Sequence, residues 1–276
     1  MSAAVRIEKR TVTGSADGKR GDSVKERVMG MVLSAATIGE YDKRIVLLTR
    51  ERGRISAFAR GARRPRSPLS ASTEPFTFGE FYIYHGRDSY SVEQVEVKNF
   101  FPELRKDLDV LYMAFYFCEV ADYFTREGMD AGAELKLLYL SLRALTVPSL
   151  PSKLVRYIYE FRMLSIQGEA PRIFSCIRCG GTGNLHHFLV QENGIVCDSC
   201  CGSGSGSQSQ TGMILSETAV ALSETAIYTL QRILSSPVEK LYTFTVGDNI
   251  LAELEQAVGR YFKAHTDREF RSGAPV

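Results

Sequence analysis

Hydrophobic and polar positions alternate along the first third of the chain with the period of a half-buried β-strand. Turn residues separate five such segments, at residues 28–38, 44–49, 55–60, 76–84 and 90–97. The alternation slips once in the fourth segment, near Gly79, and once in the fifth, near Glu93, which indicates β-bulges. Five short strands with bulges predict a small closed or partly closed barrel.

From residue 102 the apolar period lengthens to three or four residues, as in amphipathic helices. This pattern predicts three consecutive helices and, later in the chain, two more; they fall within 104–121, 135–145, 154–164, 222–233 and 250–261. We expect the first three to bury their apolar stripes against each other and the last two to pack back on them. The two groups of helices are separated by a cysteine-rich stretch and a Gly-Ser run.

The expected organisation is therefore multidomain α+β. It has a disordered polar leader (1–27), a barrel (28–101), the first part of a helical domain (102–171), a cysteine insert (172–201), a flexible Gly/Ser segment (202–212) and the second helical part (213–276). No apolar run approaches the roughly 18 residues of a membrane helix, and residues 1–10 lack the apolar core of a secretory signal. We expect a cytoplasmic protein without membrane contact.

The cysteines form the first candidate site, because five of the six lie between residues 176 and 201. Cys176 and Cys179 form one Cys-x-x-Cys pair, and Cys197 and Cys200 form another, with seventeen residues between the pairs. This spacing is typical of a four-thiolate zinc site, in which no ligand position stays open for water. We therefore expect one structural Zn²⁺. Cys201 is an alternative to Cys200, His186 or His187 could substitute for a cysteine, and cysteines without metal are the other alternative.

The second candidate site is a run of cations in a chain whose formal net charge is only +2. Between residues 43 and 66 a single acid, Glu51, opposes nine basic side chains: Lys43, Arg44, Arg50, Arg52, Arg54, Arg60, Arg63, Arg64 and Arg66. Arginine binds phosphate with two hydrogen bonds and stacks on bases, so the run indicates a nucleic-acid surface. A solvated face is the alternative. Neighbouring aromatic residues are candidate stacking platforms or core residues: Phe58, Phe81, Tyr82 and Tyr84.

Sequence motifs for catalysis are missing from this chain. It has no phosphate-binding G-x-x-x-x-G-K-[ST] loop, no G-x-S-x-G and no H-E-x-x-H, and only four histidines. No catalytic residues are proposed, and we expect a protein that is not an enzyme.

The order of these parts resembles the bacterial RecO family. The resemblance rests on the basic segment 59–67 (Ala-Arg-Gly-Ala-Arg-Arg-Pro-Arg-Ser), on segment 38–54 as its first barrel strands, on segment 174–200 as its zinc module and, more loosely, on 259–265. It covers roughly residues 29–270. The long polar leader, Cys201 and the Gly-Ser run depart from the family pattern.

The resemblance implies an N-terminal OB-fold, a helical domain and a zinc ribbon. It implies binding to single- and double-stranded DNA and annealing of complementary strands. The implied partners are RecR, the acidic C-terminal tail of the single-strand-binding protein and, in some bacteria, RecF; together they load RecA onto DNA, so the implied location is the nucleoid. The residues leave two other functions open: an RNA-binding translation or ribosome factor, and a zinc-dependent nucleic-acid enzyme.

Overall fold

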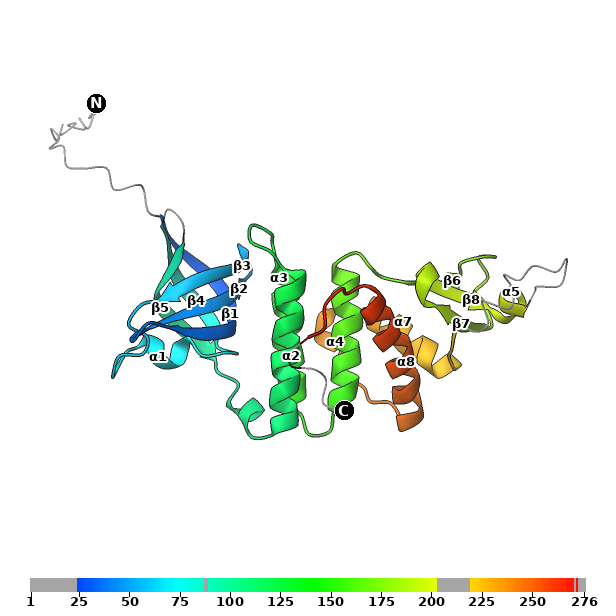
Figure 1. Cartoon of the computed structure of the whole chain (residues 1–276). Helices are drawn as coiled ribbons and strands as arrows, with labels where there is room; N and C mark the ends of the chain where they lie inside the picture. The colour runs from blue at the N-terminus through cyan, green and yellow to red at the C-terminus, as the bar shows by residue number, and fades with distance from the viewer. Residues whose placement is uncertain (1–23, 87–88, 203–218, 271, 273–276) are drawn as a thin grey trace, which may run out of the picture.

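The computed structural model describes residues 24–86, 89–202, 219–270 and 272. A strand-rich region lies at one end of the molecule, a group of helices lies in the middle, and a second, smaller sheet lies at the other end (Figure 1). Within these described ranges no helix is long and apolar enough to cross a membrane. The expected flexible segment 202–212 lies almost entirely outside the described residues.

The N-terminal region is a closed barrel with the strand order β1-β2-β3-β5-β4. Its strands are β1 (Val24–Ile38), β2 (Asp42–Thr49), β3 (Gly53–Ala59), β4 (Phe78–His85) and β5 (Tyr90–Asn99). The long strand β1 pairs with β2 on one side and β4 on the other, and this double pairing closes the barrel. A short helix, α1 (Leu69–Ser72), interrupts the connection between β3 and β4. The five predicted strands are confirmed.

Strand β1 begins four residues earlier than expected, so residues 24–27 are not part of a disordered leader. Because these residues are mostly charged, the alternation of apolar and polar positions does not reveal this part of the strand. Arg27 forms an ion pair with Glu80 of the neighbouring strand β4 at 3.1 Å, and Lys25 reaches across β4 to form one with Glu93 of β5 at 2.6 Å. Residues 1–23 lie outside the described part of the chain.

Both predicted irregularities occur where β4 pairs with β5. Tyr82 faces Gln94 and Ile83 faces Val92, so Glu93 is the extra, bulged residue. The register shifts again between Phe78 and Gly79. A Cβ on Gly79 would lie only 2.3 Å from the backbone oxygen of Glu96, so this close approach of the two strands requires glycine.

The five predicted helices are also confirmed. They are α2 (Leu108–Phe124), α3 (Gly132–Leu145), α4 (Ser152–Ile166), α7 (Glu224–Ser235) and α8 (Asp248–Ala264), with one-turn 3-10 helices at Pro102–Arg105, Val190–Glu192 and Val238–Lys240. The late helices return to the early ones as expected. Arg162 of α4 donates to the backbone oxygen of Leu234, and Tyr261 of α8 donates to that of Glu169.

The second sheet has four strands in the order β6-β8-β7-β9. They are β6 (Arg172–Cys176), β7 (Leu185–Leu189), β8 (Gly194–Cys197) and β9 (Val220–Ala221), and the short helix α5 (Asp198–Gly202) follows β8. Its buried side chains belong to the same apolar cluster as the helices. Phe188, for example, is fully buried and lies 5.5 Å from the Tyr261 ring, measured between ring centres.

Candidate nucleic-acid interface and metal centre

The hairpin of β2 and β3 divides the basic segment between the two ends of the barrel. Lys43 pairs with Ala59 at one end of this hairpin, whereas Thr49 pairs with Gly53 at the other. The second end faces the helices, because the backbone N–H of Arg54 donates to the carbonyl of Arg126. The nine predicted cations therefore do not form one surface.

Five of the cations lie toward the end of the barrel that points away from the helices, here called the free end: Arg44, Arg60, Arg63, Arg64 and Arg66. All five side chains are exposed, and none forms an ion pair with a carboxylate in the described residues. Glu40, Asp42 and Glu74 also lie at this end, and Glu93 lines a cavity together with Arg60. Asp42 accepts from the backbone N–H of Gly61 at 2.7 Å, and Glu74 and Glu93 pair with Lys43 and Lys25. The free end thus carries five arginines that none of these acids pairs with.

The loop after β3 folds back onto the turn between β1 and β2. The Arg63 backbone N–H donates to the Tyr41 carbonyl at 2.9 Å, and its guanidinium donates to the carbonyls of Gly39 and Glu40. The Arg64 guanidinium lies 5.4 Å from the centre of the Tyr41 ring, within cation–π distance. These contacts fix the arginines in place relative to the turn.

Tyr41 is the functional candidate that the sequence pattern missed. Its side chain is 42% exposed, and it contacts Arg63 through the backbone and Arg64 through the ring. A hydrogen bond to the Glu40 side chain raises the pKa of the Tyr41 hydroxyl, so the phenol stays neutral. The sequence did contain one signal for Tyr41, which is its position in a turn just before the basic strand.

The aromatic residues that the sequence pattern predicted as stacking platforms are less accessible. Phe81 belongs to the barrel core, and Tyr82 donates to Glu96 at 2.8 Å. Phe58 and Tyr84 are half-buried.

Three of the predicted cations have carboxylate partners. Lys43 is almost fully buried, and its ammonium contacts Glu74 at 2.6 Å and the Ser70 carbonyl at 2.9 Å. At the other end Arg52 pairs with Glu26 at 3.1 Å, and Arg54 pairs with Asp122 of α2 at 2.9 Å. Carboxylates of the chain neutralise these three cations, so they do not add to the charge of the five free-end arginines.

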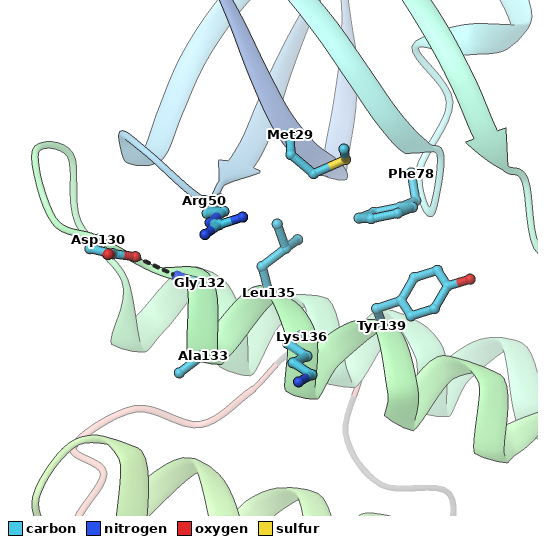
Figure 2. Close-up of a pocket in the computed structure, with 9 residues that line it drawn as sticks. All are labelled: Met29, Arg50, Phe78, Asp130, Gly132, Ala133, Leu135, Lys136 and Tyr139. Carbon is cyan, nitrogen blue, oxygen red and sulfur yellow. Dashed lines mark hydrogen bonds between the residues drawn. The ribbon is translucent and has the colours of Figure 1, made fainter. Parts of the chain in front are cut away.

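Arg50 lies at the junction between the barrel and the helices, far from the free end. Figure 2 shows it beside a cavity of about 510 Å³ whose lining comes from the barrel and from the α3 region: Met29, Arg50, Phe78, Asp130, Gly132, Ala133, Leu135, Lys136 and Tyr139. The backbone N–H of Arg50 donates to the Met29 carbonyl, and its carbonyl accepts from Ala131. This arginine therefore belongs to the contact between the two regions.

The second sheet brings the four predicted cysteines together. Strands β7 and β8 form an antiparallel hairpin, which places Cys197 and, on α5, Cys200 beside Cys176 and Cys179. The four sulfur atoms all lie within 4.8 Å of one another, and the Cys179 and Cys197 sulfurs are 3.7 Å apart. In a tetrahedral zinc site with Zn–S bonds of about 2.3 Å, sulfurs are about 3.8 Å apart. The donor set and its spacing fit a metal ion.

Hydrogen bonds prepare one of these thiols for metal binding. Burial raises the pKa of Cys176, but backbone N–H groups of Cys179, Cys197 and Arg178 outweigh it and lower that pKa to about 6. Hydrogen bonds to the sulfurs of Cys197 and Cys179 instead raise the pKa of Cys200 to about 12. A metal ion bound by these thiols would displace their protons.

The alternatives to these four ligands lie outside the cluster. Cys201 is not one of the four residues whose sulfurs converge. His186 and His187 each contact the Asp198 carboxylate at 3.0 Å instead. The converging sulfurs therefore include that of Cys200 and not that of Cys201.

Comparison with known proteins assigns the family. Residues 24–101 match the family described as "Recombination protein O N terminal", and residues 105–274 match "Recombination protein O C terminal". The chain belongs to the RecO family. Curated RecO relatives named "DNA repair protein RecO" include those of Acetivibrio thermocellus (31% identity over 88% of this chain and 93% of the relative) and Symbiobacterium thermophilum (30% over 89% and 94%). The RecO of Alkaliphilus metalliredigens is 28% identical over 87% and 93%. Membership confirms the predicted resemblance and assigns the chain to DNA repair and recombination.

Proposed function

We propose that this RecO-family chain binds single- and double-stranded DNA at the free end of its barrel and anneals complementary strands without bond-making chemistry. The observation that carries the proposal is the set of five exposed arginines without carboxylate partners. The strand order of the barrel supports its assignment as an OB-fold, a barrel that binds oligonucleotides.

Annealing follows from electrostatics alone. Arginines that neutralise phosphates on two strands reduce the repulsion between the strands, so complementary bases can meet. Contacts to phosphate give affinity without sequence preference. Tyr41 adds a ring on which an unpaired base can stack, which favours single strands over duplex.

The four cysteines hold one structural Zn²⁺ in this proposal. Four thiolates complete the tetrahedral coordination of zinc, so the ion braces the second sheet and offers no open position to a substrate. The family further supports a mediator role with RecR, the tail of the single-strand-binding protein and, indirectly, RecF and RecA.

A triple substitution tests the role of the free end. Arg44→Gln, Arg60→Gln and Arg64→Gln together remove three charges and keep most of each side chain. We expect affinity for single-stranded DNA to fall about 100-fold at 0.1 M salt, and the slope of log K against log salt to shrink by about 2. Annealing is expected to slow in parallel, with and without bound single-strand-binding protein.

The matched control removes exposed cations elsewhere. Arg143→Gln and Lys153→Gln lie on α3 and α4, and neither residue has a carboxylate partner in the described part of the chain. The control is expected to bind DNA as the unmodified chain does. A triple variant with unchanged affinity and salt slope would rule out the free end. Equal affinity for RNA and DNA, without annealing, would favour an RNA-binding function instead.

A further inference from the structure

A second exposed aromatic surface lies on the cysteine side of the molecule. Helix α7 and the edge strand β6 enclose a cleft of about 380 Å³, lined by Phe174, Tyr228, Gln231, Arg232, Ser235 and Ser236. Phe174 is 52% exposed and Tyr228 is 62% exposed. Both rings therefore present accessible area to a ligand, and they do so in the same cleft.

The backbone holds the two rings on rigid elements. Phe174 follows the fully buried Ile173 in β6, and the Ile173 carbonyl accepts from the Gln231 side chain at 2.7 Å. Gln231 and Arg232 lie three and four residues after Tyr228, on the same side of α7. The cleft is therefore preformed, because one hydrogen bond ties its strand wall to its helix wall.

The charge of the cleft is positive. The Arg232 guanidinium stacks on Phe244 at 4.8 Å, and its Nε is buried without a hydrogen-bond acceptor in the described residues. Arg172, two residues before Phe174, is exposed and forms no ion pair within the described chain. No acid lines the cleft; Glu224, one helical turn before Tyr228, is the nearest along α7.

We infer that this cleft is a second binding site for single-stranded nucleic acid, with bases on Phe174 and Tyr228 and phosphates near Arg172 and Arg232. A base has apolar faces and a polar edge, and the cleft offers two rings beside an amide and two hydroxyls. An acidic peptide would use the same arginines but would leave both ring faces without a matching partner.

The inference rests on the proposed function and extends it. The barrel lies at one end of the molecule and β6 lies toward the other, with the helices between them (Figure 1). Two strands, or two stretches of one strand, can then be held by one chain. Holding both reactants raises their effective concentration, which speeds annealing without any new chemistry.

The chain contains no tryptophan, so a single introduced one reports on its own site. We expect stacking of (dT)20 to quench the fluorescence of Tyr228→Trp, and also that of Tyr41→Trp at the free end. Adding the three free-end substitutions to Tyr228→Trp is expected to leave its quenching in place. Quenching at Tyr41→Trp alone would overturn the second site and leave the proposed function standing. Quenching at Tyr228→Trp alone would overturn the proposed function of the free end and leave the second site standing.

A loss-of-function pair tests the consequence for annealing. Arg172→Gln with Phe174→Ala is expected to slow annealing at least 5-fold, with unchanged binding of a short oligonucleotide at Tyr41→Trp. Arg178→Gln is the matched control on the same module, because Arg178 is already paired with Glu192 at 3.2 Å. Equal annealing rates in both variants, or quenching of Tyr228→Trp by poly-aspartate rather than by (dT)20, would contradict the inference.

Discussion

The barrel and the cysteine-bearing sheet lie at opposite ends of the molecule (Figure 1), and they differ in what fills their interiors. The barrel encloses its own apolar cluster, which comes entirely from residues 28–92. The second sheet has strands of only two to five residues, and its buried side chains share a cluster with the helices. The barrel has a core of its own besides the residues, such as Met31, Leu33 and Leu48, that pack against the helices, whereas the sheet shares its buried cluster with the helices.

This difference explains where each region can carry charge. The barrel packs against the helices with only part of its surface, through residues such as Met31 and Leu48, so five arginines at the free end stay exposed and without an ion pair in the described residues. The small sheet instead gathers four thiols whose spacing fits a metal ion. Four predictions test this contrast, beginning with the largest expected effect.

Removing a metal ligand should affect only the sheet and the helices it shares a core with. Cys200→Ser is expected to lose zinc on dialysis against a chelator, while the adjacent Cys201→Ser retains about one zinc per chain. Elemental analysis measures the zinc. Amide exchange should become fast in β6 and β8 of Cys200→Ser and stay slow in the barrel. Equal zinc contents of the two variants would contradict the ligand assignment.

Truncating one buried ring in each region should separate the two cores. Phe81→Ala in the barrel and Phe188→Ala in the sheet are each expected to lower the free energy of unfolding by about 3–5 kcal/mol. Denaturant titration measures the loss, and hydrogen exchange locates it. Exchange should rise only in the barrel for Phe81→Ala, but in the sheet and α8 for Phe188→Ala. Exchange that spreads across both ends in both variants would show a single cooperative core.

Two adjacent cations of β2 should behave in opposite ways. Lys43→Met breaks the contact with Glu74 and is expected to cost about 1–2 kcal/mol of stability, with DNA affinity nearly unchanged. Arg44→Met removes an exposed charge and is expected to lower affinity about 5-fold at 0.1 M salt, with stability unchanged. Thermal melts and binding titrations measure both. If Lys43→Met lost much of its affinity for DNA while its stability stayed unchanged, Lys43 would belong to the binding surface.

The smallest expected effect concerns strand preference. Tyr41→Leu is expected to weaken binding of single-stranded DNA by about 1 kcal/mol, or about 5-fold, and to leave duplex binding unchanged. Tyr41→Phe keeps the ring and serves as the control. If both variants bind single strands alike, the ring has no stacking role and the arginines alone account for binding.

Local patterns in the sequence predicted most elements of the fold. The alternation of apolar residues located the barrel strands, including the bulge at Glu93, because a strand exposes successive side chains on opposite faces. The spacing of Cys176, Cys179, Cys197 and Cys200 predicted the sulfur cluster, because two-residue loops bring paired thiols to one point. The pattern failed at residues 24–27, where cross-strand ion pairs replace apolar contacts.

By itself, the sequence determined the five barrel strands, the five long helices and the two cysteine pairs, since those depend on neighbours a few positions apart. Only the tertiary structure decided which cations are free. The carboxylates that neutralise Arg52, Lys43 and Arg54 lie 26, 31 and 68 positions away along the chain, so no local count of charge reveals them. The β2–β3 hairpin then sends the remaining arginines to different ends of the barrel, because its two strands run in opposite directions.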